Sequence, residues 1–99
     1  MNFNEWFKLK EASDSIENQI RNAYYQISGG RKDRVRLADL RNTLRSVPRQ
    51  ELDHALLNMA RSGQIALFQF DNPMEKTPAD TEAALVLPTG NVRHVMYMA

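Results

Sequence analysis

The sequence contains no cysteine, only two histidines and no long apolar run, and each of these absences removes a class of protein. Without cysteine there is no disulfide, no thiol nucleophile and no cysteine-bound zinc. No apolar run approaches the roughly 20 residues that a membrane span needs, and the first residues lack the basic-then-apolar order of a secretory signal. We therefore expect a cytoplasmic protein that has no membrane partner.

The residues that could carry catalysis are also sparse. His54 and His94 are far apart in the chain and have no dense carboxylate cluster near them, so their spacing does not indicate a metal site. The sequence has no glycine-rich phosphate loop and no nucleophile elbow. Glu51 and Asp53 are two positions apart and face different sides of a helix, so they cannot share a substrate. We expect no enzymatic activity, no metal and no cofactor, with His54 as a surface polar residue.

A chain of 99 residues fits one small domain, which buries a modest core and gains stability from a partner subunit. Its 13 basic and 12 acidic side chains nearly balance, but they are unevenly distributed. Residues 31–62 hold eight basic and four acidic groups, whereas acidic groups outnumber basic ones in residues 1–30 and in residues 63–99. The middle of the chain therefore carries all of the excess positive charge.

Seven of the eight basic residues in the middle segment are arginines. They are Arg31, Arg34, Arg36, Arg41, Arg45, Arg49 and Arg61. The planar guanidinium matches a phosphate or a guanine edge through two hydrogen bonds, whereas lysine would serve equally well for solubility alone. The pattern favours a nucleic-acid partner, and a solvated basic face is the alternative.

Two arrangements are open for the first 28 residues. Phe3, Trp6 and Phe7 share one stripe of a helix, and a second helix start at Asp14 would place a bend near Ser13. This two-helix arrangement is our preferred prediction. A continuous helix over 3–28 is the alternative, because apolar residues recur in steps of three and four throughout. In both cases Gly29 and Gly30 end the helix.

The rest of the chain alternates short helices and strands. A very short strand at 35–37 leads into a helix over 37–45, and a tight turn with Pro48 leads into a helix over 48–62. A strand is expected at 65–70, and Thr77, Pro78 and Asp80 indicate the start of one or two helical turns that reach residue 84. Extended segments are expected at 85–87 and 92–98 around a turn at 88–91. In the helix over 48–62, Leu52, Ala55, Leu56 and Met59 form the buried face, while Gln50, His54 and Arg61 point the other way.

This order of elements, with the segment LADLRNTLRSVPRQELDHALLNMARSGQIALFQF (37–70) at its centre, resembles the winged helix-turn-helix superfamily. The resemblance implies a small α+β fold, with a three-helix core, a short β-sheet wing and an extra N-terminal helix. It divides the chain into an aromatic helix over residues 1–12, a candidate dimerisation element, and a winged helix domain over residues 13–99. The segment 71–91 is longer than a simple wing hairpin requires, so an insertion that folds back is an alternative to a reaching wing.

The resemblance implies binding of double-stranded DNA by a transcriptional regulator or a DNA-associated accessory factor. The helix over 48–62 would enter the major groove, where Gln50, His54 and Arg49 would meet base edges. The phosphate contacts would come from four further arginines, namely Arg34, Arg36, Arg41 and Arg45.

Other features leave a second class of function open. Leu57 lies toward the outer face of the helix over 48–62, and an apolar side chain there suits a protein partner better than a DNA groove. A winged-helix protein-interaction module that docks a larger assembly is therefore the alternative function. For Phe3, Trp6 and Phe7 we expect the interface of a two-fold homodimer. The alternative is that this helix folds back across its own domain.

Overall fold

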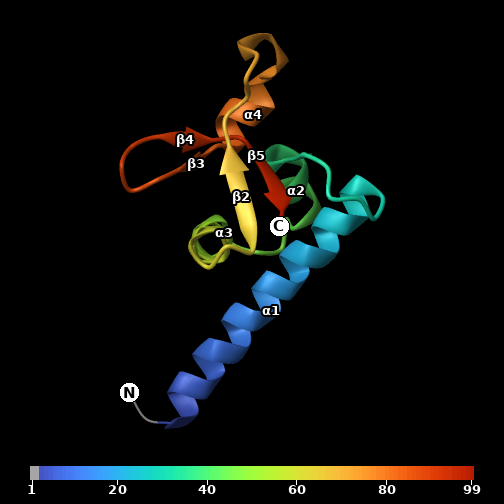
Figure 1. Ribbon diagram of the computed structural model, residues 1–99. Coiled ribbons are helices and arrows are strands. Elements are labelled where there is room, and N and C mark those ends of the chain that lie inside the picture. Colours follow the sequence, from blue (N-terminus) through green and yellow to red (C-terminus); the bar gives the residue numbers. More distant parts are fainter. Residues whose placement is uncertain (1–2) are drawn as a thin grey trace.

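Residues 3–99 form four α-helices, one turn of 3₁₀ helix and two small antiparallel sheets, shown as a computed structural model in Figure 1. The structure describes the backbone of residues 3–99 and the side chains of residues 15–99. The helices are α1 (Phe3–Ser28), α2 (Leu37–Thr43), α3 (Arg49–Arg61) and α4 (Pro78–Ala83), with the 3₁₀ turn η1 at Pro73–Glu75. The strands are β1 (Val35–Arg36), β2 (Ile65–Phe68), β3 (Leu85–Val86), β4 (Val92–Arg93) and β5 (Val95–Met98).

The N-terminal helix is continuous, so the preferred prediction of two helices with a bend near Ser13 is wrong. No proline or glycine interrupts residues 3–28, and Asp14 therefore lies within the helix rather than at a new start. Gly29 and Gly30 end the helix as predicted, with φ of 70° and 85°. The N-terminal half of α1 extends past the rest of the domain (Figure 1), and no break in the backbone separates residues 3–12 from the residues that follow.

The helix pair over 37–62 agrees closely with the prediction. α2 ends at Thr43, a tight turn follows in which the Val47 N–H donates to the Leu44 carbonyl at 3.0 Å, and α3 begins at Arg49. Pro48 lies one residue before the helix instead of in its first turn, and its carbonyl accepts from the Leu52 N–H at 3.0 Å. Proline is well suited to this place because it has no N–H to leave unbonded.

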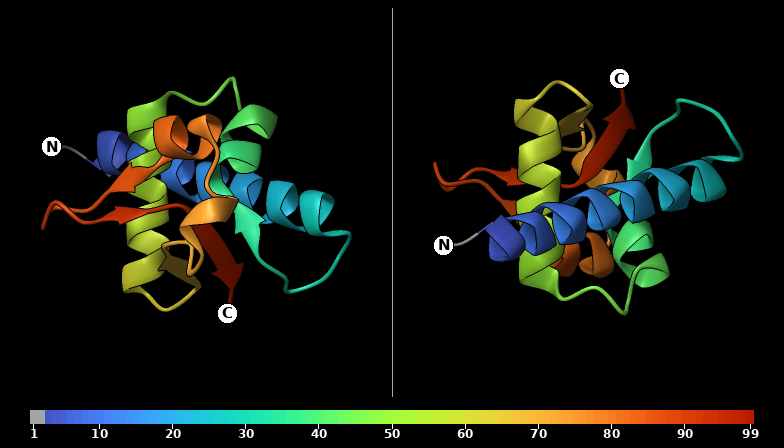
Figure 2. Two further views of the ribbon diagram at one scale, coloured as in Figure 1. Left: turned by 90° about the horizontal axis from the view of Figure 1, so that it is seen from above. Right: turned by 90° about the horizontal axis from the view of Figure 1, so that it is seen from below.

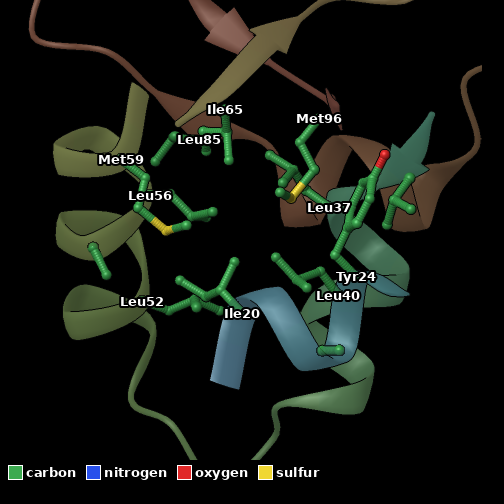
Figure 3. Packing of buried hydrophobic residues seen from close by; sticks show 13 residues of the cluster. Ile20, Tyr24, Leu37, Leu40, Leu52, Leu56, Met59, Ile65, Leu85 and Met96 are labelled. Atoms are coloured by element: carbon green, nitrogen blue, oxygen red, sulfur yellow. The ribbon is translucent and has the colours of Figure 1, made fainter. Parts of the chain in front are cut away.

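The core lies where α1, α2 and α3 meet the inner face of the larger sheet. Figure 3 shows Ile20 and Tyr24 of α1, Leu40 of α2 and Leu56 of α3 pointing into one shared interior, and each of these side chains is fully buried. The buried face of α3 is the predicted one, with Leu52, Ala55, Leu56 and Met59. Burial of such apolar side chains contributes about 1.5 to 3 kcal/mol each, so this cluster is the main source of stability.

The larger sheet has the strand order β1-β5-β2, and all its pairs are antiparallel. Val35, Met96 and Leu67 share one register row on the core side, while Arg36, Val95 and Phe68 share the next row on the outer side. The strand predicted over 65–70 ends at Phe68, and the extended segment predicted over 92–98 is divided at His94 into β4 and β5. The division lets β4 pair with β3 in a separate two-stranded sheet.

The long segment between β2 and β5 folds back onto the helices and also forms a projecting hairpin. η1 and α4 come first, and α4 packs against α2. The predicted helical turns near 77–84 are confirmed, with a capping box in which the Thr77 side chain and the Asp80 side chain each bond the other's backbone. The β3–β4 hairpin then extends past α3 (Figure 1). Across residues 3–99, no helix is both long and apolar enough to cross a membrane.

Candidate nucleic-acid interface

The outer face of α3 carries several exposed polar side chains, with the partly buried Leu57 among them. Gln50, His54 and Arg61 recur at helical spacing opposite the buried face, and all three side chains are exposed as predicted. None of them forms a side-chain hydrogen bond or an ion pair within residues 15–99. Two acidic residues flank this face: Glu51 is exposed, and Asp53 is 27% exposed and lies beside Arg41 and Arg49. The face therefore offers donors and acceptors with no partner of their own among the described residues.

Two projecting elements flank α3. In the view from above, the β3–β4 hairpin crosses in front of α3, and in the view from below α1 crosses it instead (Figure 2). The hairpin and α1 therefore lie on opposite sides of α3, and both continue beyond it. The hairpin tip consists of Pro88, Thr89 and Gly90, and Gly90 adopts a φ of 92° that favours glycine. A ligand that reaches the outer face of α3 would meet this tip.

Arg36, expected to touch phosphate, is instead paired with a buried carboxylate. Its guanidinium donates to Asp80 Oδ2 at 2.6 Å, and the Asp80 side chain is only 1% exposed. The same oxygen accepts from the Thr77 N–H at 2.8 Å and from the Thr77 hydroxyl at 2.9 Å. This contact joins β1 to the start of α4, so Arg36 fixes the inserted segment to the sheet.

Arg41 and Arg49 hold the other end of α4. The Arg41 Nε donates to the Ala83 carbonyl at 2.8 Å, and its Nη2 lies 2.6 Å from Asp53 Oδ1, close but not aligned for a hydrogen bond. The Arg49 guanidinium donates to the carbonyls of Glu82 and Ala84. Arg41 is 12% exposed, whereas Arg49 remains 52% exposed. These two arginines close the C-terminus of α4, where free carbonyls favour positive charge.

The remaining predicted arginines differ in their surroundings. Arg34 forms an exposed pair with Glu75 at 2.8 Å, and its guanidinium lies 5.4 Å from the centre of the Phe70 ring. Arg45 is exposed at the end of α2 and donates within its own turn, to the Asn42 carbonyl. Among the seven predicted DNA-binding residues, the structure thus brings Gln50 and His54 together on one face, with Arg45 free of a carboxylate partner within residues 15–99. Arg34, Arg36, Arg41 and Arg49 instead contact the inserted segment.

Sequence reasoning missed the residues that bind these arginines. Asp80 is the central one, and its signal was present in the sequence, because Thr77 followed three residues later by an acid is a capping box. Its ion-pair partner, Arg36, is 44 residues away in the sequence, so the spacing of residues in the sequence does not predict this pair. Burial raises the pKa of Asp80, but the two Thr77 hydrogen bonds and the Arg36 charge together outweigh burial and hold this pKa below 3.8. The carboxylate therefore stays charged inside the fold.

His94 is buried beside the same cluster. Its ring stacks on Phe70 with the centroids 5.6 Å apart, and Nδ1 is buried without a hydrogen-bond partner among the described residues. Burial, followed by the charge of Lys76, lowers the pKa of His94 below 6.5 against the opposing charge of Asp80. His94 is therefore neutral at pH 7. Within the described residues, no three histidine or acidic side chains gather in a way that could hold a metal ion.

The predicted dimer residues, Phe3, Trp6 and Phe7, lie outside residues 15–99, whose side chains the structure describes. Comparisons with protein-family models, with curated protein sequences and with solved structures each find no match for this chain.

Proposed function

We propose that this domain is a winged helix-turn-helix that binds double-stranded DNA, with α3 in the major groove and the β3–β4 hairpin as its wing. The order of elements supports the proposal, since α2 and α3 are joined by a tight turn and a small antiparallel sheet follows. The hairpin, which extends past α3, has the position that a wing needs to reach the backbone of a duplex. A transcriptional regulator or a DNA-associated accessory factor is the expected class.

The observation that carries this proposal is the outer face of α3. Its polar side chains are exposed and have no partners within residues 15–99, whereas the inner arginines are occupied. Gln50 can make two hydrogen bonds to adenine, and His54, one turn further along the helix, can reach the next base edge. Arg45 and Arg61 lie near the two ends of this face and would contact phosphate. The proposal does not use Arg36 or Arg41.

The test is fluorescence anisotropy on a random duplex at two salt concentrations. Phosphate contacts release counterions, so affinity should fall steeply as salt rises. On a selected high-affinity site, Gln50→Ala should change the preferred base at one position by about 1 to 3 kcal/mol. Gln26→Ala is the matched control, because Gln26 is an exposed glutamine on α1, away from α3. Affinity that does not depend on salt, or equal losses on all sequences for Gln50→Ala, would contradict the assignment.

A protein-interaction module is the second candidate, and exposed apolar side chains favour it. Phe68 is 49% exposed and Val86 is 60% exposed. Exposed apolar surface of this kind marks protein interfaces more often than DNA interfaces. Binding through these residues would be nearly indifferent to salt, which separates the two candidates in the same titration.

We further propose that the protein is a homodimer through Phe3, Trp6 and Phe7. The proposal rests on the sequence stripe and on the extension of α1 beyond the domain. Sedimentation equilibrium should give a dimer for the intact chain at tens of micromolar and a monomer for the Trp6→Glu, Phe7→Glu double variant. An intact chain that is already monomeric, or a variant that remains dimeric, would remove this helix from the interface.

A further inference from the structure

Strand β2 forms one edge of the larger sheet, and its free side is open. The strand order β1-β5-β2 leaves β2 with one neighbour. The Ala99 N–H donates to the Gln64 carbonyl at 3.0 Å, which fixes the phase of the β2–β5 pairing. In an antiparallel pair the bonded positions alternate, so Ala66 and Phe68 turn their peptide groups toward β5. Ile65 and Leu67 turn theirs to the opposite side, where no other strand bonds to them.

A groove of about 590 Å³ runs along this free edge. The four residues of β2 form one wall, Leu87 and Pro88 of the hairpin form the other, and Leu57 and Ala60 of α3 line it from below. Figure 1 shows the arrangement, with the free side of β2 facing α3 and the hairpin. The walls are largely apolar and have peptide groups on one side. This combination is what an added strand requires, because main-chain bonds give affinity and apolar pockets hold alternate side chains.

The positive charge of the groove favours a negatively charged ligand. Two arginines line it, Arg61 and Arg93, and none of its lining residues is acidic. The Arg93 guanidinium donates only to the carbonyl of its neighbour Val92, so within residues 15–99 it has no carboxylate partner. An exposed apolar edge strand with no covering element is a hazard for aggregation, and natural proteins usually cover or charge such edges. The two arginines charge this edge positively, and a negatively charged strand would complement them.

We propose that the free edge of β2 binds an extended acidic peptide segment of a partner protein, which adds to the sheet as a fourth strand. Its apolar side chains occupy the space between β2 and the hairpin, and its carboxylates pair with Arg61 and Arg93. The proposal shares Arg61 with the proposed DNA-binding face, but it uses the peptide groups of β2 and Arg93 in place of Gln50 and His54. A second copy of β2 is a poorer occupant, because it would place arginine against arginine.

The test uses a synthetic ten-residue peptide of alternating valine and glutamate, with a valine and lysine peptide as the charge control. Hydrogen exchange followed by NMR should show that the acidic peptide slows exchange of the Ile65 and Leu67 amides. The Ala66 and Phe68 amides already face β5, so their exchange should change little. Binding without protection at Ile65 and Leu67 would overturn the strand addition. Equal binding of the lysine peptide would overturn the preference for acid.

Two variants separate the groove from the rest of the molecule. Arg93→Glu should weaken the acidic peptide about tenfold, whereas Arg31→Glu, an exposed arginine in the loop after α1, should not. Ala60→Phe should fill the groove and abolish peptide binding while the circular dichroism of the domain is unchanged. Gln50→Ala should leave peptide binding intact, so the loss of one activity is distinguishable from the loss of the other. Protection of Ile65 and Leu67 that rises with protein concentration alone would show that a second copy is the occupant and overturn the proposal.

Discussion

The inner and outer arginines of this domain come from the same basic stretch of sequence and are used in opposite ways. The inner ones, Arg36 and Arg41, lie against Asp80 and Asp53 and fix α4 to the body of the fold. The outer ones, Arg45 and Arg61, have no carboxylate partner within residues 15–99. A charge excess in a sequence therefore measures how many cations a segment has. It does not say how many of them remain available to a ligand.

The outer position of Arg61 depends on the helical phase of α3, which Leu56 and Leu57 can test. Leu56 is fully buried at the centre of the core, whereas Leu57 is only partly buried beside the groove. Leu56→Ala should lower the free energy of unfolding by about 2 to 5 kcal/mol, because it leaves a cavity, and Leu57→Ala should cost far less. Urea denaturation of both variants measures the difference. The reverse order would mean that the outer face is misassigned.

The ion pair between Arg36 and Asp80 is expected to stabilise the fold more than an exposed pair does. Asp80→Ala removes both the partner of Arg36 and the side chain that accepts from the Thr77 N–H in the capping box of α4, so it should lower the free energy of unfolding by about 2 to 4 kcal/mol. Glu75→Ala is the matched control, because its pair with Arg34 is exposed on both sides, and should cost less than about 1 kcal/mol. Similar losses for the two variants would show that burial of the ion pair does not matter here.

Acid should lower the free energy of unfolding, as removal of the Asp80 carboxylate does. The folded-state pKa of Asp80 lies below 3.8, so the folded form binds this proton less readily than the unfolded form. The stabilisation that the charged Asp80 side chain provides is therefore fully present above pH 3.8, and it is lost as the pH falls through the lower pKa of the folded state. Asp80→Asn should remove that part of the acid dependence.

Most of the helical framework could be predicted because it depends on local signals. The spacing of apolar residues placed α2 and α3 within two residues of their observed ends, and Thr77 with Asp80 marked the start of α4. The bend near Ser13 was wrong because a capping pattern within a strong helix does not stop it. Local chemistry at Asp14 resembles a helix start, but the apolar stripe continues through it.

The partners of the arginines could not be predicted, and the reason is long-range topology. Arg36 and Asp80 are brought together by the pairing of β2 with β5 and by the return of the inserted segment to the sheet. The positions of Arg36 and Asp80 in the sequence do not predict that the inserted segment folds back onto the sheet. The outer face of α3 was predictable because helical rotation alone determines it.

A smaller effect concerns His94, the neutral neighbour of the inner cluster. Its folded-state pKa lies below 6.5, so the unfolded form binds a proton more readily. The stabilisation that depends on neutral His94 is fully present above about pH 6.5, and it falls as the pH drops from there toward the lower pKa of the folded state. Thermal unfolding between pH 7 and pH 5 should show this loss, and His94→Gln should reduce it. His54→Gln, on the exposed outer face, should leave it unchanged, and an equal response of both variants would refute the assignment to His94.

The smallest effect separates the two arginine sets directly, through the salt dependence of duplex binding. Each phosphate contact contributes about one unit to the slope of log affinity against log salt. Arg61→Ala should reduce that slope by about one and weaken binding on all sequences alike, with little change in stability. Arg41→Met, which keeps much of the side-chain bulk, should leave the slope unchanged and lower the free energy of unfolding, because Asp53 then loses its nearer partner and keeps only Arg49 at 4.0 Å. Both variants must be compared below their unfolding transitions, so that unfolded protein does not mimic weak binding. If Arg41→Met flattens the slope and Arg61→Ala does not, the inner arginine contacts phosphate and the division between the two sets is wrong.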